Sequence, residues 1–321
     1  MLKEIQNNNK ITHRYLKGSC NEVNGEFIAT LAVQNACDTT TFTVDNIVIL
    51  ESSKAEFSSI EKTCVNTNII FQNNSILGEE SGCIKNADVT WNFGDGTIKK
   101  FFSVNTINNI QHLYTVPGMY DVTLSINTKC GISSFTKEIC IEPEITPSFD
   151  VNALEGCIPF QLNATNTADL SQLCSAPTYD WTISYQAANC ETASDWEFID
   201  SSDKTSENPK FLFKKAGIYT ITRKISTECG DKFTSKVITV KKPPITTINP
   251  ISDFCENSKI NPTAVIENCT QNPDEVIYKW TFPGGIPASS TSLNPGEIVF
   301  NTPGVYTISL EVTNECGVSN T

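Results

Sequence analysis

Apolar and polar residues alternate along several stretches of the chain, the pattern of a β-strand with one buried face. In residues 120–126, Tyr, Val, Leu and Ile alternate with Asp, Thr and Ser, and residues 306–312 repeat the alternation. Successive side chains of a strand point to opposite faces of its sheet, so a period of two places the apolar side chains on one face. Because no stretch shows convincing helical periodicity, the pattern predicts an all-β protein.

The alternating segments belong to an internal repeat. Three runs contain a tyrosine followed ten positions later by a cysteine and then a glycine: PGMYDVTLSINTKCG, AGIYTITRKISTECG and PGVYTISLEVTNECG. A fourth run, GEFIATLAVQNACD, keeps the spacing with phenylalanine as the aromatic residue. Successive aromatic residues are 93, 99 and 87 positions apart (Phe27, Tyr120, Tyr219 and Tyr306). This distance fits one small β-sandwich per repeat.

Further landmarks recur in the same order in each complete copy. A tryptophan opens a strand upstream of the tyrosine, and two cysteines come before the tryptophan: Cys64, Cys83 and Trp91, then Cys157, Cys174 and Trp181, then Cys255, Cys269 and Trp280. Proline-bearing linkers at 142–147 and 241–246 separate the copies. Such short linkers are not flexible, and we expect them to hold the sandwiches in an extended, semi-rigid string.

The repeats predict four domains. Residues 1–52 hold the C-terminal part of one repeat, residues 53–143 a complete copy, residues 144–242 a copy with an insertion, and residues 243–321 a copy whose last strand is missing. We therefore expect the chain to be part of a longer array.

The second copy closely resembles a known family. VTWNFGDG at 89–96 followed by IQHLYTVPGMYDVTLSI at 110–126 resembles the PKD (polycystic kidney disease) domain, whose hallmarks are Trp-x-Phe-Gly-Asp-Gly, His-x-Tyr and Pro-Gly-x-Tyr-x-Val-x-Leu. Residues 144–242 and 243–321 resemble degenerate copies, which keep the tryptophan and the Gly-x-Tyr strand but lack Gly-Asp-Gly. His-Arg-Tyr at 13–15 echoes His-Leu-Tyr at 112–114, so residues 11–52 resemble the tail of another copy.

This resemblance implies both a fold and a function. PKD domains are immunoglobulin-like β-sandwiches of secreted and cell-surface proteins, usually spacers or adhesive modules. Cysteine-bearing tandem copies rich in Asn, Lys, Ile and Thr are similar to surface adhesins of Bacteroidetes-type bacteria, including the gliding-motility adhesins. The resemblance implies a non-enzymatic extracellular stalk or adhesin segment. The alternative is a set of accessory spacer or carbohydrate-binding modules of a secreted enzyme that degrades polysaccharide or protein.

Composition narrows the possible partners. A net charge of −13 with only two arginines argues against a nucleic-acid surface, which needs clustered basic residues. No apolar run approaches the roughly 20 residues of a membrane helix, and the first 15 residues lack the apolar stretch of a signal peptide. We therefore expect no membrane span here, and surface glycans or proteins as partners.

The thirteen cysteines indicate disulfides and an oxidising compartment, with buried free thiols as the alternative. No C-x-x-C pair occurs and only two histidines are present, so a zinc site is not expected. In an immunoglobulin-like topology the B–C and F–G loops share one end of the sandwich. The resemblance thereby implies three pairs at that end and two at the other: Cys83–Cys130, Cys174–Cys229, Cys269–Cys316, Cys64–Cys140 and Cys157–Cys190. The partners of Cys20, Cys37 and Cys255 stay open.

No catalytic, cofactor-binding or metal-ligating residue is predicted. Gly-Asp-Gly at 94–96 is interpreted as a hairpin turn, because glycine and Asp95 tolerate a positive φ and calcium would need six to eight oxygen ligands. His112 is expected to pack beside Tyr114 within the sandwich. The repeated tryptophans are expected in the cores. Trp196, in the insertion of the third copy, is the expected exposed aromatic and the candidate ligand contact.

Overall fold

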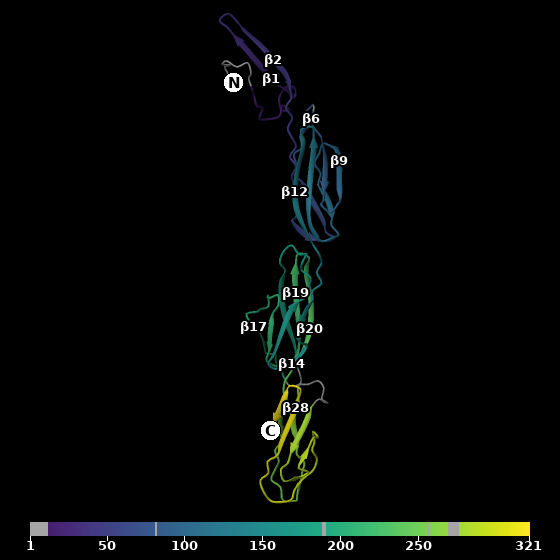
Figure 1. The fold of residues 1–321 in the computed structure, drawn as a ribbon, viewed down its shortest axis with the longest axis vertical. Coiled ribbons are helices and arrows are strands. Elements are labelled where there is room, and N and C mark those ends of the chain that lie inside the picture. Colours follow the sequence, from purple (N-terminus) through teal and green to yellow (C-terminus); the bar gives the residue numbers. More distant parts are fainter. Residues whose placement is uncertain (1–11, 81, 188–190, 256, 269–275) are drawn as a thin grey trace. The chain divides into compact units, whose positions relative to one another are not determined.

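The computed structural model describes residues 12–80, 82–187, 191–255, 257–268 and 276–321 (Figure 1). Strands dominate this part of the chain, with one short 3-10 turn at Val23–Gly25. The chain divides into two compact units, Met1–Glu144 and Ile145–Thr321. The expectation of an all-β protein is confirmed.

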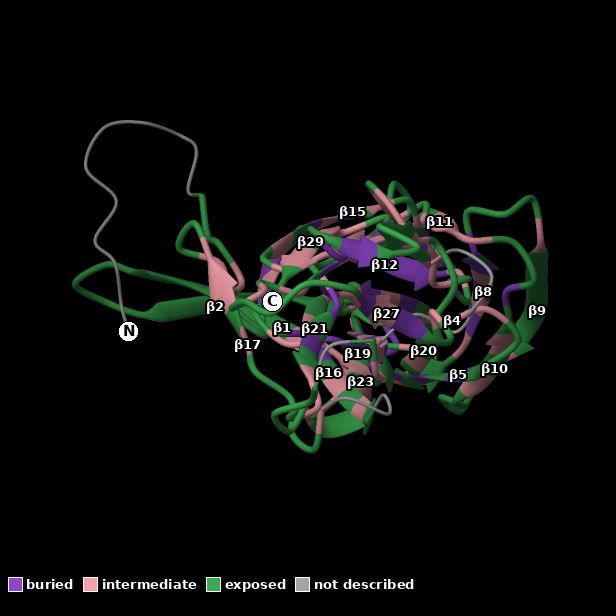
Figure 2. Cartoon of the chain, turned by 90° about the horizontal axis from the view of Figure 1, so that it is seen from below, coloured by how far each residue is buried: buried purple, intermediate pink, exposed green. Residues whose placement is uncertain are grey.

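The first unit begins with a β-hairpin of β1 (Phe27–Gln34) and β2 (Thr39–Ile47). Figure 2 shows this hairpin exposed along almost its whole length. A complete sandwich follows. One sheet has the order β10 (Ile110–Leu113), β5 (Asn68–Asn73) and β3 (Phe57–Ser58). The other has the order β4 (Lys62–Cys64), β12 (Gly131–Glu142), β11 (Gly118–Thr128), β8 (Ala87–Asn92) and β9 (Ile98–Val104). A small hairpin joins β6 (Glu79–Glu80) and β7 (Ile84–Lys85).

The period-two pattern of the sequence becomes the core of this sandwich. Val122, Leu124 and Ile126 of β11 are fully buried, while the polar residues between them are not. Leu124 lies opposite Trp91 of β8, and Trp91 packs against Phe57 and Phe71 of the other sheet. The expected position of this tryptophan in the core is confirmed.

The second unit contains two sandwiches. One sheet of the first sandwich has the order β13 (Phe149–Val151), β15 (Phe160–Asn166), β18 (Lys210–Phe213), β17 (Trp196–Ile199). Its other sheet has the order β14 (Glu155–Cys157), β20 (Gly230–Lys241), β19 (Gly217–Thr227), β16 (Thr178–Ala187). The second sandwich has three sheets. One pairs β21 (Ile245–Ile248) with β23 (Ala264–Glu267), and another has the order β22 (Lys259–Ile260), β27 (Ile298–Phe300), β25 (Gly285–Ile286). The third has the order β26 (Ser289–Ser290), β24 (Ile277–Thr281), β28 (Ser309–Asn314), β29 (Gly317–Asn320).

Each sandwich has its own hydrophobic core. Among the described residues the core clusters are centred on Trp91, Trp181 and Trp280, and each cluster lies within one expected repeat. The last strand of the final copy was expected to be missing, but its first residues pair with β28 as β29. The repeat therefore corresponds to one packed sandwich.

Candidate functional site at the junctions between repeats

The Gly-Asp-Gly segment forms the turn between β8 and β9. Gly94 and Gly96 have φ values of 81° and 90°, a region that glycine enters without strain. Asp95 Oδ1 accepts a hydrogen bond from the Thr97 N–H at 2.8 Å, and the Phe93 N–H donates to the Thr97 carbonyl. The interpretation of this segment as a hairpin turn is confirmed.

His112 ties this turn to the opposite sheet. Its Nε2 lies 2.7 Å from Asp95 Oδ2, its ring stacks on Phe93 at 4.1 Å, and it meets Tyr114 edge-on. Burial raises the pKa of the Asp95 carboxyl, but hydrogen bonds from His112 and Thr97 outweigh it and lower the pKa overall. Tyr114 donates to the Phe93 carbonyl at 2.8 Å, and burial raises the pKa of its hydroxyl. The polar groups of Asp95, His112 and Tyr114 are therefore used in contacts within the sandwich, and these contacts hold the β8–β9 turn against β10.

Trp196 does not form the exposed platform that the sequence suggested. It begins β17, is half-buried, and packs against Phe198 and Phe211 at centroid distances of 5.4 and 6.3 Å. The reason is strand pairing: β17 joins the edge of the sheet beside β18, with Trp196 opposite Phe213. The side chain is part of the core packing of its sandwich.

Within the described ranges no cluster of three or more His, Cys, Asp or Glu side chains could hold a metal ion. The arrangement that distinguishes this chain lies instead where one repeat meets the next.

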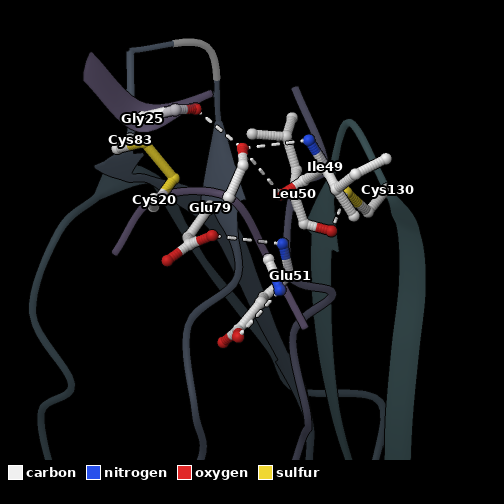
Figure 3. The surroundings of a disulfide bond; sticks show 10 residues. Cys20, Gly25, Ile49, Leu50, Glu51, Glu79, Cys83 and Cys130 are labelled. Carbon is white, nitrogen blue, oxygen red and sulfur yellow. Dashed lines mark hydrogen bonds between the residues drawn. A yellow bond between two sulfur atoms is a disulfide. The ribbon is translucent and has the colours of Figure 1, made fainter. Parts of the chain in front are cut away.

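The first junction is closed by a disulfide between Cys20 and Cys83 (Figure 3). Cys20 lies before the hairpin β1–β2, and Cys83 lies in the turn between β6 and β7 of the complete sandwich. Their sequence separation of 63 residues corresponds to about 4 kcal/mol of stabilisation on the chain-entropy estimate. Gly25 lies against this disulfide, and a Cβ there would be 2.9 Å from Cys83 Sγ.

Hydrogen bonds support the disulfide. The buried Ser19 donates its hydroxyl to the Gly25 carbonyl at 2.7 Å, and its backbone N–H donates to the Ile49 carbonyl at 2.7 Å. The Glu51 N–H donates to Glu79 Oε2 at 3.2 Å, while the Glu79 N–H donates to the Glu51 carbonyl at 2.9 Å. Figure 3 shows the contact between Glu79 and Glu51 beside the disulfide. The first repeat is thus fastened to the sandwich by the disulfide and by the hydrogen bonds between Glu51 and Glu79.

The second junction is closed by a disulfide between Cys157 and Cys316, 159 residues apart in sequence. Cys157 ends β14 of one sandwich, and Cys316 lies in the turn between β28 and β29 of the next. The chain-entropy estimate for this loop is about 5 kcal/mol. Two sandwiches of the second unit are therefore crosslinked.

Polar contacts surround this disulfide as well. Lys241 Nζ lies 3.1 Å from a carboxylate oxygen of Glu155 and 3.1 Å from one of Glu315. Burial lowers the pKa of Lys241, but hydrogen bonds to these two carboxylates outweigh it and raise the pKa overall. The buried Asn314 donates Nδ2 to the Lys242 carbonyl at 2.9 Å, and its Oδ1 accepts from the Cys316 N–H.

Three of the expected disulfide pairs are wrong. Cys83 bonds to Cys20 and leaves Cys130 as an exposed free thiol, while Cys157 and Cys316 bond to each other and exclude both Cys157–Cys190 and Cys269–Cys316. Cys190 and Cys269 lie outside the described residues. These predictions fail for a physical reason. The repeat pattern indicates the loop in which each cysteine lies, but it does not indicate which loop of a neighbouring repeat faces that cysteine.

The other candidates are disulfide-bonded. Cys64 and Cys140 lie on the neighbouring parallel strands β4 and β12, and both form disulfides, as do Cys174 and Cys229. The pairings Cys64–Cys140 and Cys174–Cys229 stay predictions. Among the described cysteines, Cys37 and Cys255 are exposed free thiols like Cys130. No partner was predicted for Cys20. It does not match any of the cysteine positions that recur in the repeats, and this difference is the feature of the sequence that could have indicated a bond to another repeat.

Comparison with known structures gives the class of the protein. An I-band fragment of titin superposes with a TM-score of 0.50 at 10% identity, covering 84% of this chain and 95% of the fragment. A mutated variant of the same three-immunoglobulin-domain fragment gives 0.51 at 10% identity, covering 84% and 96%. The chain is therefore a tandem array of immunoglobulin-like β-sandwiches.

Family models define the array more closely. Two models of the PKD domain match, one at residues 56–142 and the other at residues 254–321. The tandem array therefore contains two segments that match the PKD domain. Such domains are typically non-catalytic, and the disulfides fit an extracellular protein. In the described part of the chain no helix is both long and apolar enough to cross a membrane.

Proposed function

We propose that this chain is a non-enzymatic stalk or adhesin segment, secreted or attached to a bacterial cell surface. The observation that carries the proposal is the pair of disulfides between successive repeats, Cys20–Cys83 and Cys157–Cys316. A flexible spacer would not need covalent bonds between its domains. Bonds between repeats restrict bending at the junctions, which favours an extended, stiff string.

The separate cores support the same function. Each sandwich buries its own tryptophan in its own core, so the repeats do not need to collapse on one another to be stable. The hydrogen bonds between Glu51 and Glu79 at one junction, and the contacts of Lys241 with Glu315 and of Asn314 with Lys242 at the other, further restrict rotation. As an adhesin segment, the string would bind surface glycans or proteins, including in gliding motility.

Small-angle scattering of the oxidised chain tests the shape. We expect a rod-like profile whose maximum dimension is several times the width of one sandwich, and broader bending in the double variant Cys157→Ser/Cys316→Ser. The variant Cys37→Ser is the matched control, because it removes a free thiol and no crosslink. A compact profile for the oxidised chain would contradict the proposal.

A further inference from the structure

The first junction contains a free thiol besides its disulfide. Cys130 lies in the turn between β11 and β12, is exposed, and its Sγ donates to the Leu50 carbonyl at 4.0 Å. Leu50 belongs to the linking segment 49–51, whose other residues bind Ser19 and Glu79. Figure 3 draws Cys130 and the Cys20–Cys83 disulfide around this segment. The free thiol therefore contacts the junction that the disulfide closes.

Strand pairing brings the Cys83 and Cys130 turns to the same end of the sandwich. β8 and β11 are hydrogen-bonded neighbours, with Asp88 opposite Asn127. Cys83 precedes Asp88 by five residues, and Cys130 follows Asn127 by three. Cys83 therefore comes shortly before, and Cys130 shortly after, the paired segment at the same edge of the sheet.

The next repeat uses both of these positions in disulfides. Cys174 corresponds to Cys83 and Cys229 to Cys130, and both Cys174 and Cys229 are disulfide-bonded. Of these two positions in the first unit, Cys83 is bonded to Cys20 and Cys130 is a free thiol. Cys83 thus has two candidate partners, one across the junction and one within its own sandwich.

We propose that the first junction is a thiol–disulfide switch in which Cys20 and Cys130 compete for Cys83. The thiolate of Cys130 attacks Cys83 Sγ, a Cys83–Cys130 bond forms, and the Cys20–Cys83 bond breaks. Cys20 leaves as a thiolate and takes up a proton, as Cys130 gave one up. One disulfide and one thiol are present before and after, so no external oxidant or reductant is consumed.

The two forms differ in what they crosslink. With Cys20–Cys83 the hairpin β1–β2 is held covalently to the complete sandwich. With Cys83–Cys130 the sandwich keeps a disulfide of its own, and the covalent link across the junction is lost while the hydrogen bonds between Glu51 and Glu79 remain. This inference goes beyond a stalk function, because it makes the stiffness of one junction adjustable while the crosslink Cys157–Cys316 stays in place.

Disulfide mapping of the full chain tests the switch. The wild type is held at pH 8 without added thiol, samples are quenched with acid and alkylated at intervals, and peptides are mapped without reduction. We expect a Cys83–Cys130 peptide to accumulate together with alkylated Cys20, and to accumulate more slowly at pH 6 because the thiolate is the attacking form. In Cys130→Ser only the Cys20–Cys83 peptide is expected, and Cys37→Ser should behave like the wild type.

A second variant removes the competitor. In Cys20→Ser, air oxidation should yield the Cys83–Cys130 bond, with Cys157–Cys316 intact as the internal control for folding. Recovery of both Cys83 and Cys130 as alkylated thiols in this variant would overturn the proposal. So would a wild type in which Cys83 is bonded only to Cys20 at every time point.

Discussion

Arg223 occupies a core position that holds leucine in the other two sandwiches. It lies opposite Trp181, as Leu124 lies opposite Trp91 and Leu310 opposite Trp280. Its guanidinium donates to Asn166 Oδ1 at 2.8 Å and to the Ser148 carbonyl at 2.7 Å, and the aromatic rings around it include that of Trp181 at 5.6 Å. Burial lowers the pKa of this side chain. Hydrogen bonds and ring contacts thus offset the cost of burying a cation.

The leucine found in the other repeats should therefore be tolerated here. We expect Arg223→Leu to change the stability of its sandwich by less than about 1.5 kcal/mol, because removal of a buried charge offsets the lost hydrogen bonds. Arg223→Ala should cost about 2–4 kcal/mol because it leaves a cavity. Hydrogen exchange of peptides from β16 and β19 measures both effects, with peptides from β8 and β11 as the internal reference. Equal losses in the two variants would show that the hydrogen bonds dominate.

Asp95 gives the complete PKD sandwich a dependence on acid. Its pKa is lowered in the folded state, so its contribution to stability is present above the ordinary aspartate pKa and is lost as pH falls through the folded-state value. We expect hydrogen exchange in β8 and β10 to accelerate below pH 4 in the wild type, and Asp95→Asn to flatten that dependence. Asp121→Asn, on the exposed face of β11, is the charge-matched control. A steep acid response retained in Asp95→Asn would contradict the assignment.

Among the elements, the turn between β28 and β29 connects two sandwiches through Asn314. The equivalent residue of the preceding repeat is Thr227. Its Oγ1 accepts a hydrogen bond from the Cys229 N–H, as Asn314 Oδ1 accepts one from the Cys316 N–H. The Thr227 hydroxyl donates within its own turn, to the Gly230 carbonyl, whereas the separate amide nitrogen of Asn314 reaches the Lys242 carbonyl. We expect Asn314→Thr to preserve the turn but to accelerate hydrogen exchange at residues 240–248 by about tenfold, since a buried carbonyl loses its donor. Unchanged exchange there would show that the disulfide alone holds the junction.

The strands were the part of the fold that the sequence predicted best. The alternation in residues 120–126 predicts β11 because burial of one face leaves a direct period-two trace. The parallel pairing of β4 with β12 and of β14 with β20 left no such trace, because only three residues of each short strand take part. Trp196 was expected to be exposed, and this prediction failed for a related reason. The insertion contributes the edge strand β17, and periodicity does not indicate which strand it pairs with.

The junctions were less predictable than the sandwiches. Cysteine spacing within a repeat places Cys83 and Cys130 at one end, but a bond to Cys20 depends on which surface the previous repeat presents there. Cys157 and Cys316 illustrate the same limit over 159 residues. Contacts between repeats are set by the linkers and by buried polar groups such as Glu79 and Asn314, whose residue types are common on exposed surfaces.

For the whole molecule, the two crosslinks determine where mechanical tension would pass. A pull applied at both ends enters at Cys20 and crosses to Cys83, and later crosses from Cys157 to Cys316, so the residues enclosed by each loop carry no load. Single-molecule stretching should show extra lengthening on reduction: about 230 Å from the 63-residue loop and about 570 Å from the 159-residue loop. Cys157→Ser/Cys316→Ser should release the longer increment without reductant. In its oxidised form the chain would pass the pull through residues 83–157, while the segments 21–82 and 158–315 stay slack until the two bonds are reduced.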